Sequence, residues 1–150
     1  MDKPDSTMAE RIARAAAIFE HQRTGVVPKL VTVVQGDGTL VVTLHGALSP
    51  AEQALAESPG GATKVREFHR ELFASASEAM RQEIHRITGV KVREATAEIE
   101  PETGAMVAVF TTGTIVQVYL MKHGISPEAW NAGSGGRGSR MNRNEIQEQK

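Results

Sequence analysis

The stretch that decides the fold runs from Ala62 to Gly89 and reads ATKVREFHRELFASASEAMRQEIHRITG. Apolar side chains recur in it every three or four residues, which is the spacing of one face of an α-helix. The members of this stripe are Val65, Phe68, Leu72, Ala76, Met80, Ile84 and Ile87. Gly89 follows the last of them, where glycine most easily adopts the left-handed conformation that ends a helix. The pattern predicts an amphipathic helix about 40 Å long, whose stripe needs cover from the rest of the chain or from a second copy.

A capping box precedes the first predicted helix. Thr7 and Glu10 have the Ser/Thr-x-x-Glu spacing in which each side chain bonds the backbone of the other residue. The helix is expected to begin at Met8 and to end at Gly25. It is short and rich in alanine, so it can approach a neighbouring element closely.

A second capping box is the clearest local signal in the chain. Ser49 is the predicted cap, Pro50 takes the first helical position, and Glu52 reaches back to the cap. The resulting short helix runs to about Glu57. Residues 58–61 (Ser-Pro-Gly-Gly) are expected to break it and to reset the chain direction before the long helix.

Runs of β-branched and apolar residues predict two antiparallel hairpins and one further strand. The first hairpin joins residues 30–35 to residues 40–46 through a Gly-Asp-Gly turn. The second joins residues 90–99 to residues 105–110 through a Pro-Glu-Thr-Gly turn, and residues 114–121 form the further strand. Because the first two strands are apolar almost throughout, we expect a helix or another subunit to cover part of their second face.

This order of elements predicts an α+β fold. An antiparallel sheet of two hairpins carries the long amphipathic helix on one face, with an N-terminal helix and a short capped helix beside it. After a polar lead-in over residues 1–6, a single domain spans residues 7–131. Residues 132–150 are rich in glycine, serine and arginine, and we expect them to be a disordered tail because they contain too little apolar surface to pack.

Composition excludes several classes of protein. The 150 residues carry a formal net charge of −1 and only 4% aromatic side chains, so neither a strong basic field nor a base-stacking surface is expected. Cysteine is absent, which removes disulfides, thiolate nucleophiles and cysteine-type zinc sites. No apolar run approaches the ~20 residues of a membrane span, and the polar N-terminus lacks a signal peptide. We therefore expect a cytoplasmic protein that does not insert into a membrane.

The residues that commonly carry catalysis or bind metals show no productive spacing. Five histidines are scattered over the chain: His21, His45, His69, His85 and His123. None forms an i, i+4 pair or an HExxH motif, and no Gly-x-Ser-x-Gly is present. We expect ordinary surface or boundary histidines, no metal, no cofactor, no catalytic residues and no enzymatic activity.

One glycine segment could hold an anion. Gly60 and Gly61 stand before the long helix, whose free N–H groups and dipole attract negative charge, and Lys64, Arg66 and Arg70 follow closely. The order helix–strand–strand–helix–helix–strand also parallels one type of KH domain, which clamps single-stranded nucleic acid with a glycine loop. The Gly-x-x-Gly pattern is missing, so nucleic acid is the alternative partner and not the preferred one.

Several segments together resemble a known family. Leu44–Glu52 reads LHGALSPAE, a strand followed by the second capping box. The other similar positions are Val65, Arg66, Arg70, Leu72 and Phe73 on the long helix, Gly89–Val92, and the strand that ends at Phe110. Over about residues 8–110 the chain resembles the MpsC family, a small bacterial domain formerly of unknown function, and residues 111–131 extend beyond it.

The resemblance implies a soluble, non-catalytic accessory or regulatory protein. The family is named for a Na+-translocating membrane-potential-generating system and is also linked to bicarbonate handling. Because a chain without a membrane span offers ions no route through hydrocarbon, such a protein would act by binding membrane ion-transport components. An overhanging amphipathic helix also favours a homodimer through the stripe that includes Val65, Phe68 and Leu72. The competing hypotheses are the KH-like anion site and, with no positive support, an enzyme.

Overall fold

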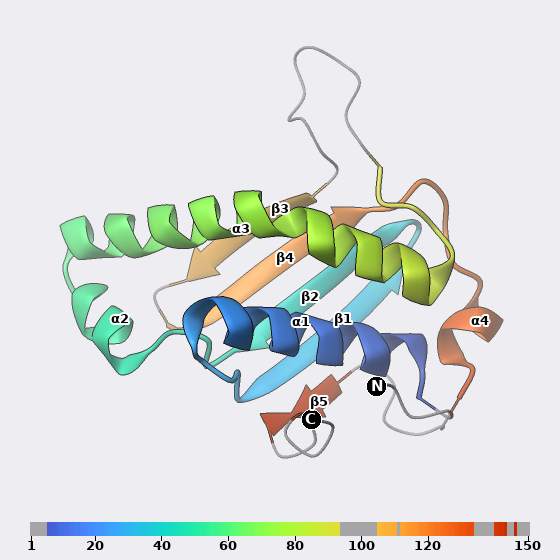
Figure 1. Cartoon of the computed structure of the whole chain (residues 1–150), viewed down its shortest axis with the longest axis horizontal. Helices are drawn as coiled ribbons and strands as arrows, with labels where there is room; N and C mark the ends of the chain where they lie inside the picture. The colour runs from blue at the N-terminus through green and yellow to red at the C-terminus, as the bar shows by residue number, and fades with distance from the viewer. Residues whose placement is uncertain (1–5, 94–104, 111, 134–139, 144–145, 147–150) are drawn as a thin grey trace, which may run out of the picture.

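Two helices pack on one face of a five-stranded antiparallel sheet in the computed structural model of the chain (Figure 1). The structure describes residues 6–93, 105–110, 112–133, 140–143 and 146. The helices are α1 (Met8–Thr24), α2 (Pro50–Leu55), α3 (Pro59–Thr88) and α4 (Pro127–Asn131). The strands are β1 (Leu30–Gly36), β2 (Thr39–His45), β3 (Ala105–Phe110), β4 (Thr114–Leu120) and β5 (Arg140–Asn142), and their order across the sheet is β3-β4-β2-β1-β5. The predicted α+β class is confirmed.

Local capping signals set the starts of α1 and α2 as predicted. The Thr7 backbone N–H donates to Glu10 Oε1 at 2.9 Å, and the Glu10 backbone N–H donates to Thr7 Oγ1 at 3.1 Å. Ser49 and Glu52 form the same pair of bonds at 2.9 and 3.1 Å. Each reciprocal pair satisfies two backbone donors that a helix start otherwise leaves open.

The long helix begins three residues earlier than the sequence pattern indicated. Ser58 is its N-cap, so Gly60 and Gly61 lie in the first turn of α3 and not in a loop before it. A β-carbon at Gly61 would lie 1.8 Å from the Leu55 carbonyl oxygen. The glycine therefore permits the end of α2 to pass directly against the start of α3, which a larger residue would prevent.

The first hairpin is confirmed, with Gly36 paired to Thr39 and a two-residue loop between them. Asp37 and Gly38 both have positive φ, 49° and 79°. This conformation at both loop positions matches the right-handed twist of the flanking strands, and Asp-Gly is one of the few pairs that adopt it readily.

The second predicted hairpin is not tested by the described residues. They show instead a pairing that the sequence pattern did not predict: β3 pairs antiparallel with β4, the run at 114–121. Residues 94–99 of the expected partner and the turn at 101–104 lie outside the described residues. Of the remaining part, Val92 forms a single antiparallel bridge with Met121, just beyond the end of β4.

The prediction of a wholly disordered tail is wrong for part of the segment. Residues 140–142 form β5, which pairs antiparallel with β1, and Met141 lies opposite Val31. Met141 is only 3% exposed, and Ile146 is buried as well. Two apolar side chains are enough to dock this polar segment on the sheet, because the edge of β1 also offers backbone hydrogen-bond partners. Composition alone does not reveal these partners.

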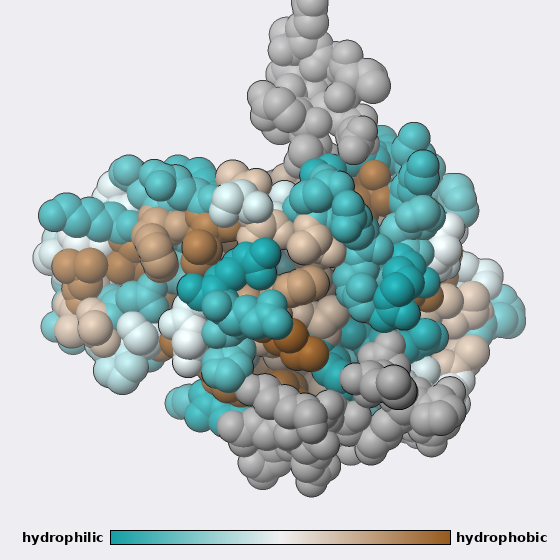
Figure 2. Space-filling model, in the orientation of Figure 1, coloured by the Kyte–Doolittle hydropathy of each residue, from teal (hydrophilic) through white to brown (hydrophobic). Residues whose placement is uncertain are grey.

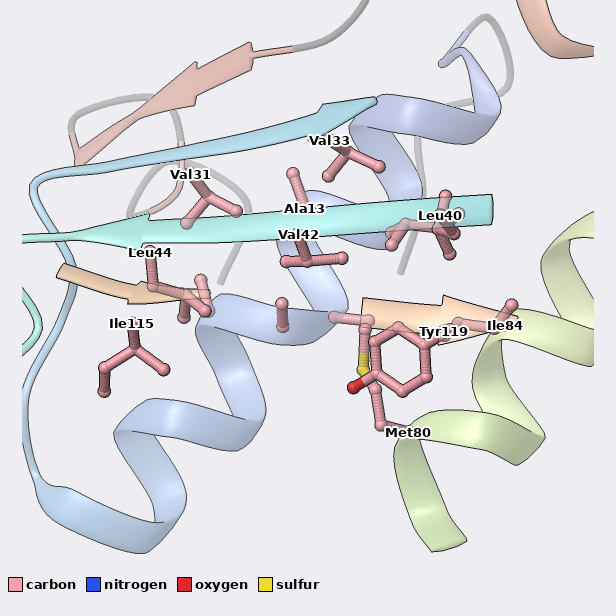
Figure 3. Packing of buried hydrophobic residues seen from close by; sticks show 14 of the residues in the cluster. Ala13, Val31, Val33, Leu40, Val42, Leu44, Met80, Ile84, Ile115 and Tyr119 are labelled. Carbon is pink, nitrogen blue, oxygen red and sulfur yellow. The ribbon is translucent and has the colours of Figure 1, made fainter. Parts of the chain in front are cut away.

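The core lies between the sheet and the pair α1 and α3 (Figure 3). Alternate side chains of the strands point toward the helices, among them Val31, Val33, Leu40, Val42, Leu44, Ile115 and Tyr119. Of the predicted stripe, Val65, Met80 and Ile84 are buried and Leu72 is half-buried. Phe68 is 51% exposed, so the described part of the chain does not cover this member of the stripe, and its cover by a second copy stays a prediction. The N-terminal turns of α3 project past the sheet together with α2, so this part of the stripe has no strand beneath it (Figure 1).

Candidate functional site

The predicted anion site is not assembled as a glycine loop. Ser58 Oγ accepts the Gly61 N–H at 3.1 Å, so the helix start is capped by its own chain. Lys64 borders a groove beside α2. Arg66 follows two residues later, about 200° around the helix axis, so these two cations point in nearly opposite directions. The loop that a KH-like clamp needs between the two helices is reduced to residues 56–58.

His69 is buried, contrary to the expectation of a surface or boundary histidine. Its side chain is 3% exposed, and its Nε2 lies 2.7 Å from Glu52 Oε2. Glu52 Oε1 accepts the Ser49 backbone N–H at the same time. A single carboxylate therefore caps α2 and ties that helix to α3.

Electrostatics keep Glu52 ionised. Burial by itself would raise the pKa of the carboxyl. The hydrogen bonds from the Ser49 backbone and from His69 favour the charged form more strongly, so the pKa of Glu52 is below its ordinary value. The charge of Glu52 is thus a fixed feature of this end of the molecule at neutral pH.

Glu20 on α1 is the second acidic group at the site, and its environment shifts its pKa in the opposite direction. It is 9% exposed, and its Oε2 makes no hydrogen bond to any described residue. Burial and the nearby negative charge of Glu52 raise the pKa of Glu20 from 4.5 to about 7, although Arg23 acts in the opposite direction. Near neutral pH this carboxyl therefore exchanges between its two protonation states.

Glu20 lines a hollow between α1, α3 and the sheet. The hollow has a volume of about 480 Å³, counting the space open to solvent at its mouth. Its apolar lining comes from Ala16 and Phe19 of α1, Leu72, Phe73, Ala76 and Met80 of α3, Val107 of β3 and Ile115 of β4. Apolar surface is visible between the two helices in Figure 2.

The polar lining of the hollow combines the ionisable Glu20, Arg23 and His69 with the uncharged Ser77, Gln117 and Tyr119. The Tyr119 hydroxyl donates to Gln117 Oε1 at 2.8 Å. Tyr119 is fully buried, and burial raises the pKa of its phenol well above the ordinary value, so the ring stays neutral. Among the described residues, no three His, Asp or Glu side chains converge as a set that could hold a metal ion. The arrangement suits binding of a small, partly apolar molecule.

Sequence reasoning missed both Glu20 and the Glu52–His69 pair. No sequence pattern singles out Glu20, and the capping-box pattern identifies Glu52 only as part of a cap. The one available signal was His69 within the apolar stretch, four residues after Val65 and therefore on nearly the same side of the helix. A polar residue at such a position needs a partner, but periodicity does not show which one.

The fold and the site define a small α+β domain with a hollow between two helices and the sheet, and the ionisable Glu20 lines this hollow. Residues 5–113 match the family described as Na+-translocating membrane potential-generating system (MpsC), so the chain belongs to the MpsC family. The match includes α1 through β3 and ends just before β4, although β4 lies between β3 and β2 in the sheet.

A relative in Bacillus subtilis (strain 168), the uncharacterized protein YbcI, is 34% identical over 71 residues. The aligned part is 47% of this chain and 57% of that protein, so the chain spans little more than half of the relative's length. No solved structure matches the chain. None of the described helices is both long and apolar enough to cross a lipid bilayer.

Proposed function

We propose that this protein is a non-catalytic accessory or regulatory protein of the cytoplasm that binds components of a membrane ion-transport system. Membership of the MpsC family supports the link, because the family is described by a Na+-translocating membrane potential-generating system. A protein in this role needs a surface for its partner. The observation that carries the proposal is an exposed apolar patch at the projecting end of α2 and α3.

The α2–α3 patch consists of Leu55 and Phe68. Their side chains are 47% and 51% exposed and border the same groove. Lys64 and Arg23 border this groove as well. Large apolar side chains rimmed by charges are typical of surfaces that bind other proteins. Figure 2 shows apolar surface at this end of the molecule, away from the sheet.

The shape of the molecule explains why this patch remains available. α2 and the first turns of α3 extend beyond the sheet, so the fold itself leaves Phe68 uncovered (Figure 1). The Glu52–His69 hydrogen bond holds the two helices together directly behind the patch. Because this hydrogen bond already joins the two helices, less backbone has to be ordered when a partner binds the patch, which makes association less costly.

Capture from the native host tests this proposal. The full-length chain, tagged and crosslinked to solubilised membranes, should recover a membrane ion-transport component that mass spectrometry identifies. Phe68→Asn should reduce that recovery at least tenfold, since a buried aromatic anchor contributes about 2 kcal/mol or more to an interface. Phe110 on β3 is also 51% exposed, so Phe110→Asn is the matched control and should leave recovery unchanged.

Three other outcomes would contradict the proposed role of the patch or assign it to a different partner. A partner that binds both variants equally well would show that the α2–α3 patch is not the contact surface. A dimer mass in light scattering that only Phe68→Asn lowers would assign the patch to a homodimer. Binding to short RNA that weakens steeply with salt would support the nucleic-acid alternative instead.

A further inference from the structure

Glu20 presents a carboxyl that the described protein leaves partly unpaired. Its side chain lies more than nine-tenths out of solvent, it lines the hollow, and its Oε2 has no hydrogen-bond partner among the described residues. Buried polar atoms in folded proteins are nearly always paired, because losing water without a replacement costs free energy. Because Glu20 also lines the hollow, its buried and unpaired oxygen marks this wall as a candidate binding site.

The charges around Glu20 favour a cation. Arg23, on the same helix, also lines the hollow and its positive charge acts on Glu20, but the residue is exposed and its guanidinium sits over the Phe19 ring at 5.4 Å from the centroid. From α2, Glu52 adds a second negative charge, and from α3, His69 is hydrogen-bonded to that carboxylate. The lining residues of β3 and β4 are uncharged. A positive group beside Glu20 would interact favourably with both carboxylates.

The remaining lining selects for an apolar body. Hydrocarbon side chains surround the hollow: Phe19, Leu72, Phe73, Met80 and Val107. A ligand therefore gains binding free energy by burying apolar surface there. The total volume of about 480 Å³ includes the open mouth, and the space that the centre of a water molecule can reach is only about 40 Å³, so the hollow suits only a small apolar body. A hydrated inorganic ion would leave this apolar lining without a partner.

We propose that the hollow between α1, α3 and the sheet binds a small molecule with a protonated amine head and a short apolar body, the ammonium group hydrogen-bonding to Glu20 Oε2. Such a head supplies both the donor and the positive charge that this oxygen lacks. The body displaces water from the apolar wall. The hollow adjoins the groove of the α2–α3 patch at Arg23, which lines both, but the proposal does not depend on the proposed function.

A titration with n-butylamine followed by NMR tests the site. The methyl signals of Met80 and Ile115, which line the hollow, should shift with saturation at pH 8. n-Butanol has the same shape without the charge, and n-butyrate has the opposite charge. Both should bind at least tenfold more weakly, because a hydrogen bond to a charged group is the stronger kind.

Variants of the full chain assign the interaction to Glu20. Glu20→Gln should lower the affinity for n-butylamine at least tenfold and bring it close to that for n-butanol. Glu71→Gln is the matched control, since Glu71 is exposed on the same long helix that supplies half of the apolar lining. Ala76→Leu places a larger side chain in the lining and should weaken the amine and the alcohol alike. Thermal unfolding of each variant confirms that it is folded.

The pH dependence gives an independent readout. The amine stays protonated between pH 6 and 8, as a lysine side chain does. With a pKa of about 7 in the free protein, the ionised fraction of Glu20 rises roughly tenfold over this range. Affinity for n-butylamine should rise by about the same factor in the native chain and stay flat in Glu20→Gln. Equal binding of n-butylamine and n-butanol, or no binding of the amine by the native chain, would overturn the proposal.

Discussion

Replacing Glu20 with glutamine should stabilise the protein at neutral pH, although it removes a charge from a buried residue. Because the folded environment raises the pKa of Glu20, the folded state prefers the protonated carboxyl. The unfolded chain has no such preference and ionises near the ordinary pKa of 4.5. As pH rises above that value, ionisation therefore favours the unfolded state. Glutamine is nearly the same shape as the protonated acid and never ionises.

The magnitude follows from the two pKa values. Below pH 4.5 the carboxyl is protonated in both states, and Glu20 contributes its full stability. Between pH 4.5 and about 7 that contribution falls, and above pH 7 the loss is complete. A rise in pKa from 4.5 to about 7 corresponds to about 3 kcal/mol of unfolding free energy. Glu20→Gln should therefore match the native chain at pH 4.5 and exceed its stability by about 3 kcal/mol at pH 8.

Urea unfolding at several pH values measures this difference directly. The other acidic group of the site acts in a separate range, since the lowered pKa of Glu52 makes its contribution disappear only as pH falls below 4.5. Glu71→Gln, on the exposed side of α3, should follow the native curve throughout. If Glu20→Gln and the native chain lose or keep stability in parallel from pH 4.5 to 8, the carboxyl is not held in an unfavourable environment and the reasoning fails.

Two further predictions concern contacts that the sequence pattern did not predict. Glu52→Ala should lower the unfolding free energy by about 2–4 kcal/mol, because it removes the cap from Ser49 and leaves buried His69 without its acceptor. A double-mutant cycle with His69→Ala should show coupling of at least about 0.5 kcal/mol, and strict additivity would contradict a working pair. Met141→Ala should cost about 2 kcal/mol or more in urea unfolding if β5 is docked as the structure has it, whereas a cost near zero would show that β5 contributes nothing.

The elements that could be predicted are those whose signals lie within a few residues. The capping boxes at Thr7 and Ser49 and the Asp37-Gly38 turn act over at most four positions. Their chemistry is complete before any tertiary contact forms, so the sequence is sufficient to place them. The long helix was predicted because its stripe repeats over about six turns, and only its start was displaced.

The errors concern pairings between distant segments. The pairing of β3 with β4 was not predicted, whereas residues 94–99 of its expected partner lie outside the described residues. Local patterns define which residues extend but not which edges meet. β5 was missed for the same reason, since Met141 is buried only through the edge of β1, about 110 residues away in the chain. Phe68 shows a second limit of local patterns. It continues a regular helical stripe, but the stripe does not reveal where the sheet beneath it ends.

The candidate site was hidden from the sequence because it depends on helix approach and not on any motif. Small side chains at Ala16 on α1 and Ala76 on α3 face the same space, so the helices can cross the sheet together without filling the gap between them. The alanine content of α1 thus predicts close packing correctly but also produces the hollow. Burial of Glu20 follows from the same approach. A charged residue at the edge of an alanine-rich stripe becomes a candidate ligand-binding group only once a second helix with its own small residues lies against it.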